Sequence, residues 1–153
     1  MNDQELADLA ERYRGTLRLA VFMTRRFDGV TGLSTTQTSI LNMIATEGLR
    51  MGTIAENLGV RVPSATEQVG RLERAGLIER RADPSDARAV VVHRTPAGDQ
   101  AAADANRRRT ARMVEAFATL GADELHALSA ALPVMDKINE RLNTFSNLKE
   151  NIA

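Results

Sequence analysis

Apolar residues recur in the middle of the chain with the spacing of short amphipathic helices. One such face collects residues at i, i+3, i+4 and i+7, namely Met51, Ile54, Ala55 and Leu58. Gly59 follows, and glycine readily adopts the left-handed backbone conformation found after many helix ends. The pattern predicts a helix over residues 51–58 that stops at Gly59.

A second short helix is predicted to begin near Pro63, because proline is well tolerated at the first helical position. Its inner face would carry Ala65, Val69 and Leu72. The opposite face would carry hydroxyl, amide, carboxylate and guanidinium groups, from Ser64, Thr66, Glu67, Gln68, Arg71 and Arg74. Side chains of these kinds reach base edges and phosphates when a helix lies in a major groove. We therefore expect these six residues, with Arg61 and Pro63 at the helix start, to contact DNA.

Two β-rich runs follow, over residues 78–81 and 89–93, with a polar loop predicted over residues 82–88. The loop contains Asp83, Pro84 and Asp86, which are typical turn residues. Arg88 would lie near the tip, where an arginine can enter a narrow minor groove, and Asp86 could hold its guanidinium in a bidentate pair. Helix, turn, helix and hairpin together predict a mainly α (α+β) fold, a winged helix-turn-helix.

Longer helices are predicted on both sides of this lobe. Residues 4–27 keep an apolar stripe that includes Leu6, Leu9, Tyr13 and Leu17. A helix opens at Ser34, with Gln37 completing a capping box, and is predicted to end at Glu47 and Gly48. After the hairpin, Thr95 can cap a helix that begins at Pro96 and reaches about residue 118. The last helix begins at Ala122 or Asp123 and carries the stripe Leu125, Leu128, Leu132 and Met135.

The first and last stripes are too long for one small lobe to cover, and an exposed apolar surface of this size indicates an interface. We expect one domain over residues 1–153, with a DNA-binding lobe over 33–95. Residues 1–28 and 96–153 would supply the helices of a homodimer.

Composition narrows the possible chemistry. The chain has no cysteine, which excludes disulfides and thiolate chemistry, and its two histidines, His93 and His126, are far apart. No metal-ligand spacing, phosphate-binding loop or nucleophile elbow is present, so we expect no enzyme activity, no metal and no cofactor. No apolar run of membrane-spanning length exists and the first residues are polar, so we expect a cytoplasmic protein without membrane association.

Charge gives a weaker indication of a nucleic-acid partner. The chain has 20 basic and 20 acidic residues, so its formal net charge is zero. Residues 61–94 carry seven arginines against five acidic residues, a local excess of +2. A basic surface for nucleic acid must therefore depend on the directions of the arginine side chains and not on the net charge.

The whole chain resembles the MarR (multiple antibiotic resistance regulator) family in the order and spacing of its motifs. The resembling segments are residues 33–37, 54–60, 63–66 and 71–78, with the wing at 83–88 followed by 95–98. The family's Asp-x-Arg wing element is matched by Asp86, Ala87 and Arg88. The sequence departs from the family pattern at three positions. Arg61 stands where serine or threonine is common, Glu67 where a basic residue is common, and Arg94 where leucine is usual.

The resemblance implies a homodimeric, sequence-specific regulator of transcription, most often a repressor, on a near-palindromic double-stranded DNA operator. It also implies a small aromatic or lipophilic effector between the dimer helices and the winged lobe, with Phe22, Arg26 and Thr38 as candidate lining residues. An alternative is a winged-helix adaptor that binds proteins and has lost DNA binding. Glu67 and the zero net charge favour that alternative.

Overall fold

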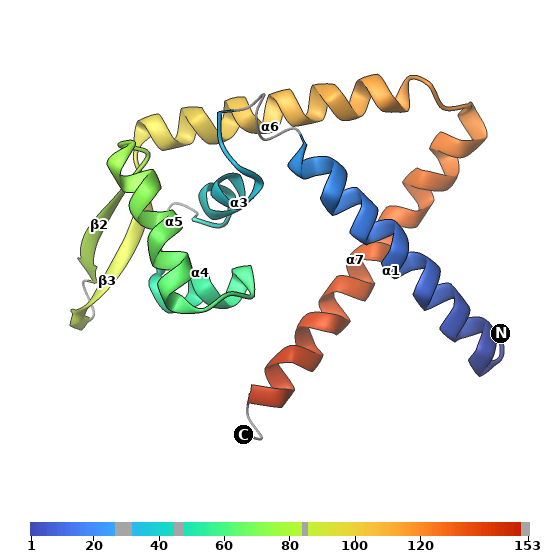
Figure 1. Ribbon diagram of the computed structural model, residues 1–153, viewed down its shortest axis with the longest axis horizontal. Helices are drawn as coiled ribbons and strands as arrows, with labels where there is room; N and C mark the ends of the chain where they lie inside the picture. Colours follow the sequence, from blue (N-terminus) through green and yellow to red (C-terminus); the bar gives the residue numbers. More distant parts are fainter. Residues whose placement is uncertain (27–31, 45–47, 84–85, 151–153) are drawn as a thin grey trace. The chain divides into compact units, whose positions relative to one another are not determined.

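The computed structural model describes residues 1–26, 32–44, 48–83 and 86–150, without the side chains of residues 87, 88 and 144–150. The chain divides into two compact units, Met1–Thr110 and Ala111–Ala153. It is mainly helical, with one small antiparallel sheet (Figure 1). The elements are α1 (Asp3–Arg25), α3 (Thr35–Met43), β1 (Leu49–Arg50), α4 (Met51–Leu58), α5 (Val62–Arg74), β2 (Ile78–Asp83), β3 (Asp86–Arg94), α6 (Pro96–Phe117) and α7 (Ala122–Glu150).

The predicted helix-turn-helix pair is confirmed by α4 and α5. α4 ends at Leu58, and Gly59 has the left-handed φ of 63° that its identity predicts. α5 has Pro63 in its first turn, and its N-cap residue, Arg61, makes no side-chain capping hydrogen bond. The short connection between the two helices therefore depends on backbone geometry rather than on a capping side chain.

The core of the first unit lies where α3, α4 and α5 meet the sheet. Its buried apolar residues come from six elements or their ends: Ile40, Leu41, Ile44, Ile54, Ala55, Ala65, Val69, Leu72, Ile78, Val92 and Ala102. Each fully buried valine, leucine or isoleucine contributes about 1.5–3 kcal/mol relative to exposure. The predicted inner face of α5 is confirmed, since Ala65, Val69 and Leu72 are all buried.

Helix α3 starts as predicted and ends earlier than predicted. The Ser34 side chain accepts a hydrogen bond from the Gln37 backbone at 3.1 Å, and the Gln37 side chain accepts from the Ser34 backbone at 2.9 Å. The expected end at Glu47 and Gly48 is wrong, because α3 stops at Met43; Glu47 itself lies outside the described residues. Ile44, the C-cap residue, has already left the helical conformation with a ψ of 89°, and Leu49 and Arg50 pair with β3 as strand β1.

The wing is a longer hairpin than the sequence predicted. The three strands lie in the order β1-β3-β2, and all pairs are antiparallel. The ladder continues through Ala82, opposite Val90, to Asp83, opposite Asp86, with a register shift between the last two pairs. The predicted 82–88 loop is therefore wrong at both ends, because backbone pairing extends into it; Pro84 and Ser85 lie outside the described residues.

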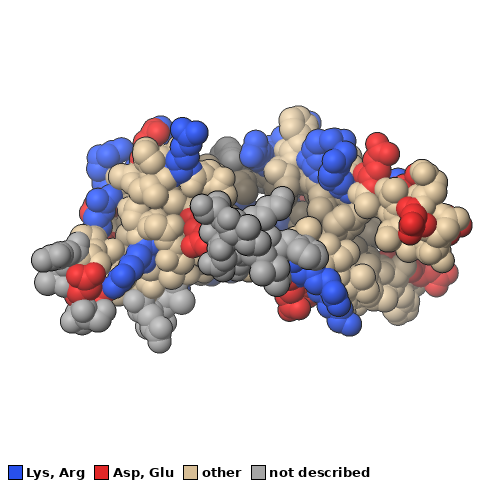
Figure 2. Space-filling view, turned by 90° about the horizontal axis from the view of Figure 1, so that it is seen from below, with Lys and Arg blue, Asp and Glu red and all other residues tan. Residues whose placement is uncertain are grey.

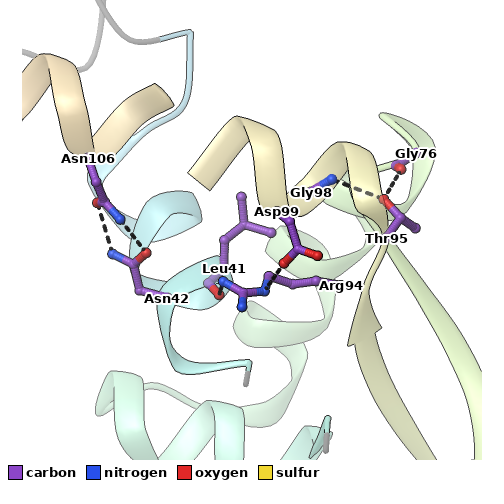
Figure 3. A network of polar contacts seen from close by, with 8 residues as sticks. All are labelled: Leu41, Asn42, Gly76, Arg94, Thr95, Gly98, Asp99 and Asn106. Atoms are coloured by element: carbon purple, nitrogen blue, oxygen red, sulfur yellow. Dashed lines mark hydrogen bonds and ion pairs between the residues drawn. The ribbon is translucent and has the colours of Figure 1, made fainter. Parts of the chain in front are cut away.

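A polar network joins the end of the hairpin to the start of α6 (Figure 3). The Thr95 hydroxyl accepts from the Gly98 backbone N–H at 3.0 Å, as predicted for a cap, and donates to the Gly76 carbonyl at 2.7 Å. Gly98 packs so closely that a Cβ there would lie 1.9 Å from the Leu77 carbonyl oxygen. The backbone of α6 is therefore in direct contact with the turn between α5 and β2.

Arg94, one of the departures from the family pattern, belongs to the same network. Its Nη1 donates to the Leu41 carbonyl at 3.1 Å, and its Nε lies 2.9 Å from a carboxylate oxygen of Asp99 (Figure 3). The side-chain amides of Asn42 and Asn106 exchange two hydrogen bonds, at 3.2 and 2.8 Å. These contacts connect the last turn of α3 and the end of β3 to the first half of α6.

The helices predicted on either side of the lobe are present. α1 begins with a capping box between Asn2 and Glu5 and contains no buried residue. In the second unit, α7 begins at Ala122, as the sequence predicts, contains Pro133, and continues to Glu150. Large apolar side chains on both helices remain exposed, and they include Leu6 at 54% and Leu132 at 52%.

The Gly98 contact makes a testable prediction about stability. Gly98→Ala should lower the free energy of unfolding by about 1–3 kcal/mol, because the methyl group forces α6 away from the Leu77 carbonyl. The matched control is Gly52→Ala in α4, where nothing lies within 4 Å of the added Cβ. That change should be neutral or stabilise by up to about 1 kcal/mol. Chemical denaturation of the three proteins measures both effects, and equal stability of the two variants would contradict the close contact.

Candidate nucleic-acid interface

Helix α5 presents its polar face to solvent because its apolar face forms part of the core. The predicted contact residues Arg61, Pro63, Ser64, Thr66, Glu67, Arg71 and Arg74 are exposed, and Gln68 is half-buried. Thr66 donates its hydroxyl hydrogen to the Val62 carbonyl at 2.8 Å, which leaves its oxygen available as an acceptor. The structure thus brings the α5 side chains that the sequence singled out onto one accessible surface.

Glu67 and Arg71 interact with each other on that surface. Arg71 Nη2 lies 2.6 Å from Glu67 Oε1, and both side chains are more than half exposed. An exposed pair at this helical spacing contributes only about 0.3–0.5 kcal/mol, so DNA can displace it easily. The pair nevertheless gives Arg71 a preferred direction along α5 before any partner binds.

Two other arginines of the helix differ from Arg71. Within the described part of the chain, neither Arg61 nor Arg74 forms an ion pair with a carboxylate. Arg61 precedes α5 and Arg74 is its last residue, so the two guanidinium groups mark its two ends. Arginines in such positions are suited to phosphate oxygens, which fix the register of a helix on a duplex.

Two predicted contact residues of the wing, Asp86 and Arg88, lie in β3. Asp86 is exposed at the start of β3. The backbone of Arg88 lies in β3, two residues further along, while its side chain lies outside the described residues. The predicted Asp86–Arg88 pair and the minor-groove role of Arg88 therefore stay predictions.

An ion pair that the sequence did not reveal connects the wing to α4. The Nε and Nη2 atoms of Arg50 donate to Oδ2 of Asp83 at 2.9 and 2.6 Å. The hydrogen bonds and charge of Asp83, with a smaller contribution from the charge of Asp86, raise the pKa of the Arg50 guanidinium above its already high ordinary value. No local sequence signal indicates this pair, because its members are 33 residues apart.

Charges of both signs share the surface of the lobe. Arg80 lies 3.3 Å from Glu73, and Arg81 pairs with Glu79. Figure 2 shows Lys and Arg side chains interspersed with Asp and Glu on the visible face, including the winged lobe at the left. On this face, positive charge is therefore carried by arginine and lysine side chains interspersed with carboxylates and not by an unbroken basic surface.

The three candidate effector residues have different environments. Phe22 is 58% exposed on α1, and the groove that it lines is formed by α1 residues alone. Arg26, the C-cap residue of α1, is also exposed. Thr38 is buried in α3, and its hydroxyl has no hydrogen-bond partner among the described residues. Their role as an effector site stays a prediction.

Neither a metal centre nor a membrane-spanning helix occurs in the described residues. No group of three or more His, Cys, Asp or Glu side chains there is placed to hold a metal ion. In the same part of the chain, no helix has the length and apolar character needed to cross a membrane.

Comparison with known sequences gives a consistent assignment. A sequence model described as the MarR family matches residues 31–89. An HTH-type transcriptional regulator of Mycobacterium leprae is 33% identical over 110 residues, which cover 71% of this chain and 77% of that protein. A second HTH-type transcriptional regulator, from Mycobacterium tuberculosis, is 33% identical over 104 residues, covering 67% and 73% of the two chains.

Solved structures agree with the sequence matches. A MarR family protein from Bacillus stearothermophilus superposes with a TM-score of 0.74 at 18% identity, over 92% of this chain and 99% of that one. The transcriptional regulator BldR from Sulfolobus solfataricus gives a TM-score of 0.66 at 28% identity, again over 92% and 99%. The fold and the exposed face of α5 define a winged helix-turn-helix DNA-binding protein. The chain belongs to the MarR family and is a DNA-binding transcriptional regulator.

The Glu67–Arg71 pair makes a prediction about DNA affinity. Glu67→Ala should strengthen binding to all duplexes and steepen the salt dependence by up to about one unit, because it removes a negative charge that repels phosphates and releases Arg71 from its ion pair. Titrations of a selected duplex and a scrambled one, at several salt concentrations, measure this.

Glu56→Ala is the control, since it removes one exposed carboxylate from α4 instead. A different outcome for Glu67→Ala, lost discrimination at a single base pair without a general gain in affinity, would contradict the electrostatic account. It would instead identify Glu67 as an acceptor for a cytosine amine.

Proposed function

We propose that this MarR-family protein is a homodimeric repressor that binds a near-palindromic operator and responds to a small ligand. The observation that carries the proposal is the exposed polar face of α5, which is held outward by the burial of Ala65, Val69 and Leu72. A helix in this position can enter a major groove with its polar face against the base edges.

In the proposed complex, contacts divide by chemistry. Gln68 and Arg71 read base edges, since an amide can bond an adenine and a guanidinium a guanine in bidentate fashion. Arg61 and Arg74 bind phosphates, and Arg88 enters the minor groove. A solved protein of similar fold, the Staphylococcus aureus MepR F27L mutant, is bound to an oligodeoxyribonucleotide, which supports DNA binding by this fold; its TM-score is 0.59 at 19% identity, over 84% of this chain and 96% of that one.

The homodimer is proposed from exposed apolar surface. α1 buries none of its residues, and α7 leaves Leu125, Leu132 and Leu142 exposed. Surfaces of this kind on a water-soluble regulator are normally covered by a partner. A second copy of residues 1–28 and 96–153 would cover them and place two recognition helices about 34–36 Å apart, one turn of DNA.

The effector is proposed by extension from the family. A small aromatic or lipophilic acid would bind near Phe22, Arg26 and Thr38 and change the distance between the two recognition helices. It can release DNA only if it binds the released state more tightly than the DNA-bound state. The buried hydroxyl of Thr38 has no hydrogen-bond partner among the described residues, which supports a polar contact with a ligand.

The competing role, an adaptor that binds only proteins, is separated from this proposal by one measurement. A gel shift with the DNA flanking the protein's own gene should show a salt-sensitive complex, because phosphate contacts release counterions. Absence of binding to this DNA, and to duplexes selected from a random library, would favour the adaptor. The Glu67–Arg71 pair favours the adaptor, because the carboxylate of Glu67 partly neutralises the positive charge on the polar face of α5.

Arg88→Ala should weaken operator binding by about 1–3 kcal/mol if Arg88 is a fixed groove contact. The matched control is Arg81→Ala, which removes an equal charge from the other strand of the hairpin. Titrations at constant salt compare the two variants with the parent. Equal losses for both would show that only the charge of the wing matters, and an unchanged affinity for Arg88→Ala would refute the contact.

Replacing Leu128 and Leu132 together with glutamate should abolish dimerisation and operator binding at the same time. Both residues lie on the apolar stripe of α7, and buried carboxylates there would lack partners. Ala130→Glu, on the opposite side of the same helix and exposed, is the control and should change neither property. Sedimentation and gel shifts measure the two outcomes. A parent protein that sediments as a monomer at micromolar concentration while binding a palindrome tightly would overturn the dimer.

A further inference from the structure

Arg50 occupies an unusual junction in the lobe. It is the second residue of β1 and also the N-cap residue of α4, where it makes no capping hydrogen bond with its side chain. Its backbone is fixed in the sheet opposite Val91, in the middle of β3. The guanidinium extends instead to Asp83, the last residue of β2. One residue therefore connects the sheet, the first helix of the helix-turn-helix and the far end of the wing.

The geometry of this pair is that of a strong ion pair. Two N–H groups of Arg50, Nε at 2.9 Å and Nη2 at 2.6 Å, donate to the same Asp83 oxygen. The Asp83 side chain is only 10% exposed, whereas that of Arg50 is 51% exposed. A carboxylate with so little access to water depends on its hydrogen-bond donors, and charge-assisted donors are the strongest available.

The far half of the hairpin needs such a support. β1 is only two residues long and pairs with Val92 and Val91 alone. Beyond Val91 the wing is therefore a two-stranded ribbon, and such ribbons are marginally stable in water by themselves. The register shift between Ala82 and Asp83 disturbs the ladder at the point where the ribbon approaches its tip. The Arg50 side chain contacts the ribbon at that point.

We propose that Arg50 is a positioning residue for the wing. Through Asp83 it holds the hairpin tip at a fixed angle to α4 and α5, so that Arg88 and the recognition helix engage DNA together. The inference rests on the proposed DNA-binding mode and adds to it a residue outside both reading elements. It predicts that the Arg50–Asp83 pair matters for operator binding even if neither member touches DNA.

A direct contact between Arg50 and a phosphate is the competing explanation, because half of its side chain is exposed. The two explanations differ in what they predict for Asp83. If Arg50 only binds phosphate, Asp83→Asn removes a negative charge and leaves affinity unchanged or higher. If Arg50 positions the wing, the same change weakens binding, although the loss of a negative charge would by itself favour binding to DNA.

The test is a double-mutant cycle with Arg50→Gln, Asp83→Asn and the combined variant, titrated against one selected operator at constant salt. We expect each single change to weaken binding by roughly 3- to 30-fold and the combined variant to be no weaker than the worse single change. Arg50→Lys should restore part of the loss, since lysine keeps the charge without the paired N–H geometry. Unchanged or tighter binding by Asp83→Asn would overturn the inference.

A second measurement follows the wing itself in the free protein. The chain has no cysteine, so Val90→Cys provides a single site for a spin label on the distal half of β3. Val90 is exposed and pairs with Ala82, next to Asp83. Label mobility should increase in Arg50→Gln and in Asp83→Asn, while the overall unfolding transition is retained. Equal mobility in parent and variants would overturn the positioning role.

The outcomes also separate this inference from the proposed function. If the parent protein binds no duplex, the proposed function fails, and the spin-label measurement still decides whether Arg50 orders the wing. If the parent binds its operator and Asp83→Asn binds equally well, the DNA-binding function stands and the positioning role is refuted.

Discussion

Burial of the inner face of α5 is the interaction on which the rest of the lobe depends. Val69 and Leu72 pack with Ile40 and Ile54 from the two preceding helices, and this packing fixes the rotation of α5 about its own axis. The polar residues of the helix point outward as a consequence. Without this packing, α5 would not hold its polar side chains on one surface, because an isolated helix of 13 residues is only marginally stable in water.

A second constraint joins this lobe to α6. Arg94 replaces the leucine usual in the family, and its guanidinium donates to the Leu41 carbonyl near the C-terminal end of α3 while pairing with Asp99. The last turn of α3 contains no basic residue of its own, so Arg94 supplies the cation that a helix C-terminus favours. The Asn42–Asn106 amide pair adds a second connection between α3 and α6. Movement of α6 would therefore be transmitted to α3.

The winged lobe and the outer helices differ in how much of their apolar surface is buried. The winged lobe has an apolar core of its own, whereas α1 has no buried residue and α7 keeps much of its stripe exposed. In the proposed homodimer, the terminal helices would be stable only when they pack against those of a second protomer. For such proteins stability depends on protomer concentration, since obligate dimers often have no stable folded monomer. DNA binding and subunit assembly would then be linked by the same helices.

The sequence alone determined what depends on neighbouring residues. The capping residues Ser34 and Thr95, the stop at Gly59 and the two faces of α5 were all predicted, because helix periodicity and capping act within a few residues. Tertiary structure decided the early end of α3, the two-residue strand β1, the longer hairpin and the Arg50–Asp83 pair. Strand β1 and the Arg50–Asp83 pair join residues far apart in the chain, and no local pattern records which distant groups will meet once the core has formed.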